Sequence, residues 1–382
     1  MPDSRHSSFS RTTKYCLAKF KSVIALTLLL IPLRLPADSV GAGQRVVTKL
    51  AEGVYEIQHK DAPDHFPQGN SVVIIGGDGV LVVDSCYLPS SAREDIAQIR
   101  QWTSKPVRYL LNTHWHNDYN QGNAAYAEAL PGLAIISLSE TAQLMALRVP
   151  TYAAEYPHRM EKFQQQLDTG MDSNGKPLTE DQKQDLKNAV AGGRAASDAI
   201  SAEFAKLKFR GPNVTFDHEL DINLGNREVQ LEFLGRGNTV GDAVAYLPKE
   251  KIVIAGDLVD SPVPYLSGGF PTEEVATLKR LEAMDFDTLV PGHGGVLKGK
   301  AFVQQEIDLI DAVINAMNQE IARSSDGPHT RFEQIKKAVE QKVDMKLWSE
   351  KFAGNDANDR DFFETWSWPS LIEAVHAELW PR

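Results

Sequence analysis

The stretch from Tyr109 to Asn123, with the sequence YLLNTHWHNDYNQGN, constrains this chain most strongly. An apolar run over Val107 to Leu111 predicts a buried strand, and a polar loop with His114, His116 and Asp118 follows it. Functional groups of α/β proteins gather in loops at the carboxyl ends of strands. Residues two apart in an extended segment point the same way, so the two histidines can reach one cation together. Imidazole with a nearby carboxylate is typical of a catalytic zinc site.

Three later segments also place ligand-type residues beside predicted strands. The run GRGNTVGD over 235–242 precedes an apolar strand at 243–247. The run IVIAGD ends at Asp257, and the run LVPGHGG delivers His293 from a third strand end. One His-x-His pair also occurs by chance in a solvated surface loop. The ordered series of glycine-rich strand ends therefore carries the prediction of a metal site.

Together these motifs resemble the metallo-β-lactamase superfamily over about residues 50 to 300. The matching runs are Thr113-His-x-His-x-Asp118, Gly-x-Thr-x-Gly-Asp242, Gly256-Asp257 and Pro291-Gly-His-Gly294. The resemblance implies an α/β fold, the four-layer αββα sandwich. It also implies that Asp84, which ends the strand VLVVD, is the acidic residue that orients a ligand histidine without binding the metal itself. The metal ligands implied by the family are His114, His116, Asp118, Asn238, Asp257 and His293.

The chain departs from the family pattern at two of these positions. Asn238 stands where the family has a third histidine, and an amide oxygen is a poorer zinc ligand than imidazole. Tyr119 stands where many family hydrolases have another histidine. Tyr119 would ligate, donate a hydrogen bond to a developing oxyanion, or only pack. Asp118, Asp257 and His293 would form an oxygen-rich second site, so the sequence predicts one or two zinc ions, with iron and manganese as alternatives.

The first 42 residues predict a secretory signal peptide. Basic residues precede an apolar run over Val23 to Leu33 that is short for a bilayer span, and a plausible cleavage site lies at Val40-Gly41-Ala42. We therefore expect a periplasmic or secreted protein with no membrane span after cleavage. The remaining chain has 34 basic and 49 acidic residues, a net charge of −15, which disfavours nucleic acid as a partner. Its only cysteine, Cys86, is expected to be a buried, inert thiol.

The rest of the chain predicts one domain over 43–322 with two helical additions. Strand signals lie at Val46 to Gln58 and Ser71 to Asp84, and strand-like alternation returns at 213–234. The polar residues 141–212 predict an inserted helical hairpin, broken early by Pro150 and Pro157, that would be a lid or substrate wall, or else a packing or subunit contact. Residues 323–382 predict a helical extension whose aromatic residues pack on the core or form a dimer contact.

We expect a metal-dependent hydrolase acting on a small molecule. Metal-bound hydroxide would attack an ester, thioester or amide carbonyl, which includes lactams. Asp118 would orient the water and take its proton, and Tyr119 is the second candidate catalytic residue. Two other readings stay open from the sequence. One is an iron-dependent oxidoreductase or sulfur-chemistry member of the same fold. The other is a non-catalytic relative with a depleted metal centre.

Overall fold

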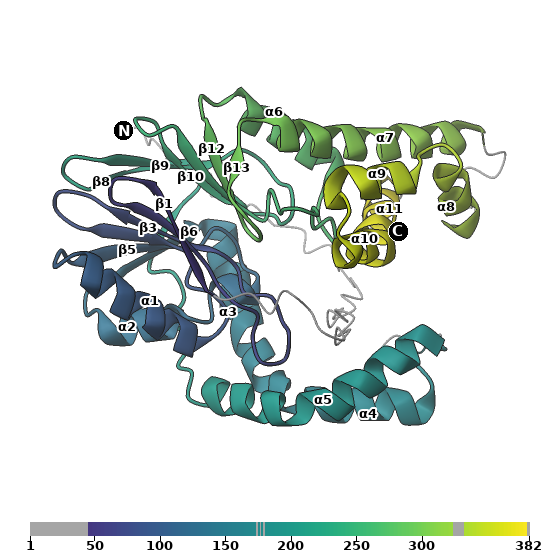
Figure 1. Cartoon of the computed structure of the whole chain (residues 1–382), viewed down its shortest axis with the longest axis horizontal. Helices are drawn as coiled ribbons and strands as arrows, with labels where there is room; N and C mark the ends of the chain where they lie inside the picture. The colour runs from purple at the N-terminus through teal and green to yellow at the C-terminus, as the bar shows by residue number, and fades with distance from the viewer. Residues whose placement is uncertain (1–44, 173–174, 176, 179, 324–331, 380–382) are drawn as a thin grey trace, which may run out of the picture.

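Two β-sheets pack face to face in the structure, a computed structural model (Figure 1). It describes residues 45–172, 175, 177–178, 180–323 and 332–379. The predicted signal peptide at 1–42 lies outside the described residues. Among the residues that are described, no helix is long and apolar enough to cross a membrane.

The first sheet follows the chain order along the amino-terminal half. Its strands are β1 Val46–Ala51, β2 Val54–Gln58, β3 Ser71–Ile75, β4 Val80–Val83, β5 Val107–Leu111, β6 Ala134–Leu138 and β7 Val214–Phe216. Strands β1 to β4 pair as antiparallel neighbours, whereas β4 to β7 are parallel. The region predicted as strand at Val46 to Gln58 is split into a hairpin, because Gly53 turns the chain with a φ of 73°.

The second sheet collects the strands of the carboxyl-terminal half. Its order is β13 Leu297–Lys298, β12 Thr288–Pro291, β11 Ile252–Gly256, β10 Ala243–Leu247, β9 Glu228–Phe233 and β8 Glu219–Asn223. Only β11 and β12 pair in parallel among these neighbours. The carboxyl ends of these two strands therefore lie at the same edge of the sheet, beside the amino end of β10.

Alternating side chains along the strands separate the layers. On β3, Val72 and Ile74 face the second sheet, whereas Val73 faces the outer helices. Helices α1 Pro89–Trp102 and α2 Asn123–Ala129 cover the outer face of the first sheet. Helices α6 Pro271–Ala283 and α7 Ala301–Arg323 cover the second. This arrangement confirms the predicted four-layer αββα sandwich.

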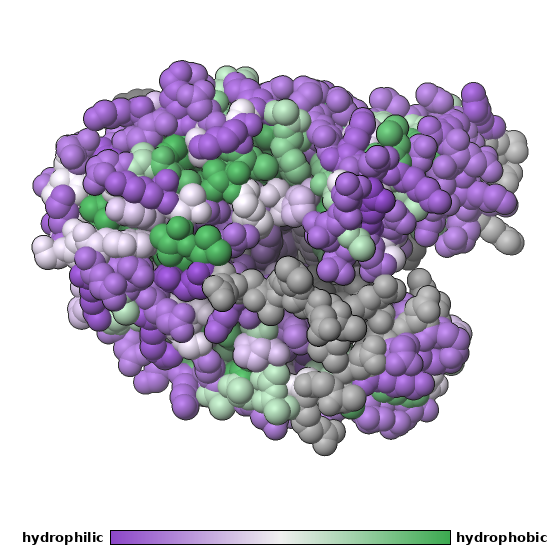
Figure 2. Space-filling model, in the orientation of Figure 1, coloured by the Kyte–Doolittle hydropathy of each residue, from purple (hydrophilic) through white to green (hydrophobic). Residues whose placement is uncertain are grey.

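The inserted segment is helical, as predicted, but its breaks differ from the prediction. It contains α3 Ser139–Glu155, the 3-10 turn η2 Tyr156–His158, α4 Arg159–Thr169 and α5 Glu180–Phe204. The expectation that Pro150 breaks the first helix was wrong: Pro150 lies exposed inside α3, and the buried Met145 and Val149 keep that helix packed. Helices α4 and α5 lie side by side as an arm with a largely hydrophilic surface (Figures 1 and 2).

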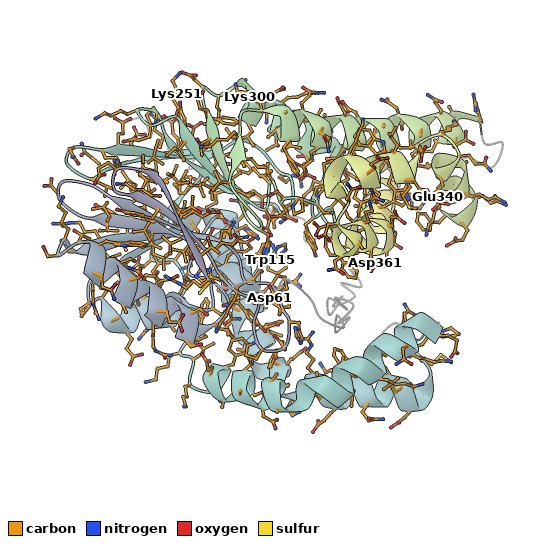
Figure 3. All side chains as sticks on the ribbon, in the orientation of Figure 1. Asp61, Trp115, Lys251, Lys300, Glu340 and Asp361 are labelled. Carbon is orange, nitrogen blue, oxygen red and sulfur yellow. The ribbon has the colours of Figure 1, made fainter. Side chains whose placement is uncertain are left out.

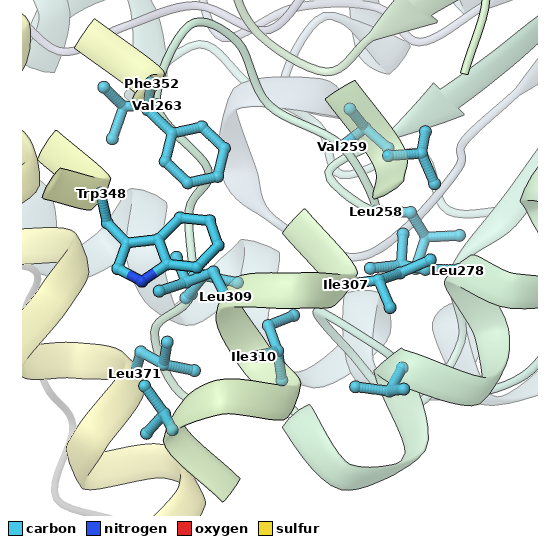
Figure 4. Close-up of a cluster of buried hydrophobic side chains, with 14 of the residues drawn as sticks. Leu258, Val259, Val263, Leu278, Ile307, Leu309, Ile310, Trp348, Phe352 and Leu371 are labelled. Atoms are coloured by element: carbon cyan, nitrogen blue, oxygen red, sulfur yellow. The ribbon is translucent and has the colours of Figure 1, made fainter. Parts of the chain in front are cut away.

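The carboxyl-terminal helices pack onto α6 and α7. They are α8 Phe332–Glu340, α9 Met345–Ala353, α10 Ala357–Phe362, the π-helical turn η4 Phe363–Ser367 and α11 Trp368–Leu379. Trp348, Phe352 and Leu371 lie against Leu309 and Ile310 of α7 (Figure 4). The expectation that the aromatic residues of this region serve core packing is therefore confirmed for Trp348, Phe363 and Trp368, which are buried in the same cluster.

Candidate metal centre

The predicted ligand loops meet at one edge of the two sheets. The loop with His114 follows β5, Asp257 follows β11, and His293 follows β12. Asn238 precedes β10, which runs antiparallel to β11, so it reaches the same edge. Asp84 follows β4, the parallel neighbour of β5. The topology thus brings together side chains from both halves of the chain.

Asp257 lies at the centre of the first group of potential ligands. Its Oδ2 atom is 3.0 Å from Nε2 of His114 and 3.3 Å from Nδ1 of His116. Ligand atoms of these three residues lie within 4.8 Å of one another, a spacing that one metal ion can bridge. His114 is almost fully buried, whereas the His116 side chain is 20% exposed, so solvent reaches the group from the His116 side.

The same carboxylate belongs to a second group with Asp260 and His293. The backbone N–H of His293 donates to Oδ1 of Asp260 over 2.9 Å. Nε2 of His293 lies 2.9 Å from Oδ2 of Asp118, which joins the second group to the loop after β5. Because Asp257 is shared, the two groups form one continuous constellation of histidine and aspartate.

Several buried polar atoms of this constellation have no hydrogen-bond partner among the described residues. They are the Tyr119 hydroxyl, Oδ1 of Asn238, Oδ1 of Asp257 and Oδ2 of Asp260. Buried polar groups without partners are rare, and each one costs stability. Their concentration at one place, on atoms that bind cations, shows that the residues present fit a metal centre.

Gly292 provides the space in which these groups converge. A Cβ atom on this glycine would lie 2.1 Å from Oδ1 of Asp257, 2.6 Å from the Tyr119 hydroxyl and 2.8 Å from Oδ1 of Asp260. Any side chain here would displace the carboxylates. The Pro-Gly-His motif therefore requires glycine at this position, because side-chain oxygens of the centre closely approach its Cα atom.

Charges at the centre shift the pKa values of its groups strongly. Burial would lower the pKa of His114, but Asp257 outweighs burial and raises it to about 9. Burial likewise opposes the rise in the pKa of His293 to about 10, which the hydrogen bond to Asp118 favours most. Burial and the charge of Asp257 raise the pKa of Asp260 well above its usual value. Protons thus balance the carboxylates in the metal-free chain, and a bound cation would replace them.

Asp84 positions His114 through an intervening residue. The backbone N–H of Thr113 donates to Oδ1 of Asp84 over 2.9 Å, and the Thr113 hydroxyl donates to Oδ2 over 2.8 Å. The same hydroxyl oxygen lies 3.0 Å from Nδ1 of His114. Asp84 therefore lies behind a ligand-type histidine, but it acts through Thr113 and not by direct contact.

Asn238 and Tyr119, the two departures from the family pattern, are both buried next to the ligand-type residues of the centre. The amide nitrogen of Asn238 faces Oδ2 of Asp257 over 3.3 Å, and its Oδ1 atom is buried at the centre without a hydrogen-bond partner among the described residues. Asn238 therefore reaches the centre, and its role as a metal ligand stays a prediction. Tyr119 is completely buried, and its ring lies 4.5 Å from that of His114.

The sequence analysis missed Asp260, which follows Asp257 by three residues. No motif marked it, because its significance depends on the fold of the irregular loop after β11. The loop after Asp260 places Tyr265 with its ring 6.3 Å from that of His116. Trp115 is labelled in the middle of the view in Figure 3, and the Arg148 guanidinium lies 5.0 Å from the centroid of the Trp115 ring.

Comparison with known proteins places this constellation in a family. The sequence model of the metallo-beta-lactamase superfamily matches residues 66–293, which include the ligand-type residues of both groups. The chain belongs to the metallo-β-lactamase superfamily. This confirms the resemblance drawn from the motifs, and it agrees with the sandwich of two sheets between helices.

Individual relatives of this superfamily member are distant. A linear primary-alkylsulfatase from Pseudomonas sp. (strain ATCC 19151) is 26% identical over 257 residues, which cover 64% of this chain and 45% of the relative. The chain thus matches less than half the length of that relative. A metallo-beta-lactamase from Pontibacter korlensis has a similar fold, with a TM-score of 0.50 and 18% identity, over 70% of this chain and 99% of the solved one.

Proposed function

We propose that this protein is a metal-dependent hydrolase of a small-molecule ester, thioester or amide. The observation that carries the proposal is the position of Asp257, which is shared by the His114–His116 group and the Asp260–His293 group. Histidine and aspartate around a shared carboxylate fit one or two divalent cations. Zinc is the first expectation, and the mixture of carboxylate and imidazole groups also suits manganese or iron.

A bound metal would supply a Lewis acid and a water molecule with a pKa near 7. The chain supplies the groups that hold and orient the reactants. His114, His116 and Asp257 would hold one ion, and Asp260, His293 and Asp257 would hold the other. Asp118, whose Oδ2 atom lies 2.9 Å from Nε2 of His293, would accept the proton of the attacking water.

We propose that the buried Tyr119 side chain stabilises the ligands of the centre. Burial and the neighbouring carboxylates, Asp257 first among them, raise the pKa of its hydroxyl well above the usual value, so the hydroxyl keeps its proton. Because the side chain is completely buried, we assign this proton to a hydrogen bond with a ligand carboxylate and not to a substrate oxyanion. Asn238 would hold Asp257 in the same way, through its amide nitrogen.

A sulfate ester of a primary alcohol is the second candidate substrate. It is favoured by the similarity to a linear primary-alkylsulfatase over 64% of this chain. The surroundings of His116 agree with such a substrate, because Trp115 and Tyr265 offer aromatic surface for an alkyl chain and Arg148 offers a positive charge. We further propose that the protein acts in the periplasm or outside the cell, since residues 1–42 have the pattern of a secretory signal.

The test is to purify the protein without chelator, measure its metal content by mass spectrometry, and assay a panel of substrates. The panel contains a nitrophenyl ester, a thioester, a lactam and dodecyl sulfate. We expect one or two zinc ions and hydrolysis of at least one substrate. Asp257→Asn should lose metal and at least about 100-fold in rate, because even residues behind a ligand affect activity 10–100-fold. Asp221→Asn, an exposed change on β8, is the matched control.

The outcomes separate the alternative readings. Hydrolysis of dodecyl sulfate alone would favour the sulfate ester, and hydrolysis of carbonyl substrates alone would favour the first candidate. Bound iron with redox activity and no hydrolysis would overturn the proposal in favour of an oxidoreductase. No metal and no hydrolysis would overturn it in favour of a non-catalytic binding protein.

A further inference from the structure

A second buried histidine lies behind the metal centre. His59 follows β2, and its side chain is 1% exposed. Its Nδ1 atom lies 2.8 Å from the backbone oxygen of Gly69, and its Nε2 atom lies 2.8 Å from Oδ2 of Asp95 in α1. Arg45 donates to the other oxygen of Asp95 over 2.8 Å. None of these residues belongs to either group of potential metal ligands around Asp257.

The partners of His59 determine its protonation. A backbone carbonyl can only accept a hydrogen bond, so Nδ1 must carry a proton. Arg45 donates to Oδ1 of Asp95, and Oδ2 of the same carboxylate accepts from Nε2, so Nε2 carries a proton as well. His59 is therefore an imidazolium ion inside the protein. Burial opposes this charge, but Asp95, and next Cys86, outweigh burial and raise the pKa of His59 well above its usual value.

The segment that His59 holds touches both metal loops. The backbone N–H of Gly69 donates to the backbone oxygen of Asp118 over 3.3 Å. The backbone N–H of Asn70 donates to Gly292 over 2.8 Å, and its side-chain amide donates to the carbonyls of Pro291 and Gly294 over 3.1 and 2.9 Å. Gly69 and Asn70 thus connect the loop of Asp118 with the loop of His293.

The geometry of Gly69 makes this connection sensitive to small shifts. A Cβ atom at this glycine would lie 2.2 Å from the ring of Tyr119, so the Gly69 backbone is in close contact with the Tyr119 side chain. A displacement of the Gly69 carbonyl would move Tyr119 and the Asp118 backbone together.

An alternative reading of the same cluster is a separate metal site, since ligand atoms of His59, Cys86 and Asp95 lie within 4.8 Å of one another. The hydrogen bonds argue against an ion here. Both ring nitrogens of His59 and both oxygens of Asp95 already have partners. An ion bound between His59 and Asp95 would have to displace the proton that joins Nε2 of His59 to Oδ2 of Asp95.

We propose that His59 is a positioning residue: as a buried imidazolium anchored by Asp95 and Arg45, it holds Gly69 and Asn70 so that the Asp118 and His293 loops stay in register. The proposal rests on the proposed metal centre but not on hydrolysis. It places Asp95 and Arg45, about 50 residues apart in the chain, in support of the same centre.

Two amide substitutions separate the two hydrogen bonds of His59. Asparagine places an amide nitrogen near the position of Nδ1, so His59→Asn keeps a donor for Gly69 and loses the contact with Asp95. Glutamine places its nitrogen near the position of Nε2, so His59→Gln keeps a donor for Asp95 and loses the one for Gly69. His59→Asn should therefore be the less stable variant, and His59→Gln the one with the weaker metal centre.

The readout is zinc affinity, measured by competition with a chromogenic chelator on variants shown to be folded by circular dichroism. We expect His59→Gln to weaken zinc binding about tenfold, as for residues behind a ligand, and His59→Asn to weaken it by less than about threefold. Thermal unfolding of the metal-free proteins should rank the two variants in the opposite order. Equal zinc affinities, or affinities that simply follow stability, would overturn the positioning role.

Two further measurements test the charge and the rival metal site. Nitrogen NMR of the His59 ring in the metal-free protein at pH 7 should show both nitrogens protonated, and a neutral ring would overturn the imidazolium. Cys86→Ser should leave the zinc content unchanged, and a loss of one ion per chain would establish a metal site at Cys86 instead. None of these readouts requires a substrate, so they stand or fall separately from the proposed hydrolysis.

Discussion

The carboxylate of Asp118 lies 2.9 Å from Nε2 of His293, although the two residues are 175 positions apart in the chain. This contact joins the loop after β5 in the first sheet to the loop after β12 in the second. The metal centre is therefore assembled across the interface between the two sheets, and changes that separate the sheets at this edge should affect metal binding before they affect the fold.

Asp260 is expected to be a metal ligand, and its amide variant tests this without changing its shape. Asp260→Asn keeps an oxygen that can accept from the His293 backbone, while it removes the negative charge. We expect the loss of one metal ion per chain, with the ion at His114 and His116 retained, and a fall in hydrolysis of about 10-fold or more. Metal content after extensive dialysis is the measurement, and unchanged content would remove Asp260 from the ligand set.

Gly292→Ala should disrupt both groups of ligands at once. The added methyl carbon would lie 2.1 Å from Oδ1 of Asp257, which real Cβ atoms do not tolerate, so the carboxylate must move. We expect loss of zinc affinity by at least about tenfold in a chain that remains folded. Gly295→Ala is the matched control, because a Cβ atom there meets nothing within 4 Å. Equal zinc binding by the two variants would show that the site adapts to the methyl group.

Asn238→His should strengthen the His114–His116 group. The substitution brings an imidazole to a buried position whose amide nitrogen now lies 3.3 Å from Asp257, and imidazole is a better zinc ligand than an amide. We expect tighter zinc binding, and one additional ion if the native chain holds only one. Zinc titration of the metal-free variant measures this. A native protein that already binds two zinc ions tightly would show that Asn238 does not deplete the centre.

The residues that sequence reasoning found and missed differ in the range of their interactions. His114, His116 and His293 each follow an apolar strand, so the ordered series of such strand ends along the sequence predicted them. Asp260 lies in an irregular loop, and the support that His59 gives to Gly69 depends on a contact with a distant helix. Such contacts arise from tertiary packing, which leaves no periodic signal in the sequence.

The orientation of Asn238 shows the same limit within a correctly predicted motif. The family pattern placed this residue at the centre, and the structure does so too. Which end of its amide faces the centre depends on the carboxylate of Asp257, nineteen residues further along the chain. A motif specifies the position of a side chain, whereas its hydrogen-bonding role is decided by its neighbours in space.

Glu56 on β2 should make the stability of the metal-free chain depend on pH. Its side chain is buried on the same strand face as Val54, and Oε1 has no partner among the described residues. Burial raises its pKa from 4.5 to about 7. Between these values the unfolded chain loses the proton while the folded chain keeps it, so the stability contributed by Glu56 is present below pH 4.5 and is lost as the pH rises to about 7.

Glu56→Gln removes this titration and keeps the size of the side chain. We expect the variant to gain about 2 kcal/mol in free energy of unfolding relative to the wild type at pH 8, and little or nothing at pH 4.5. Urea unfolding of both proteins in excess chelator at the two pH values measures the difference, and the exposed change Glu228→Gln on β9 is the control. A gain of the same size at both pH values would mean that packing, and not the charge of a buried carboxylate, sets the cost of this residue.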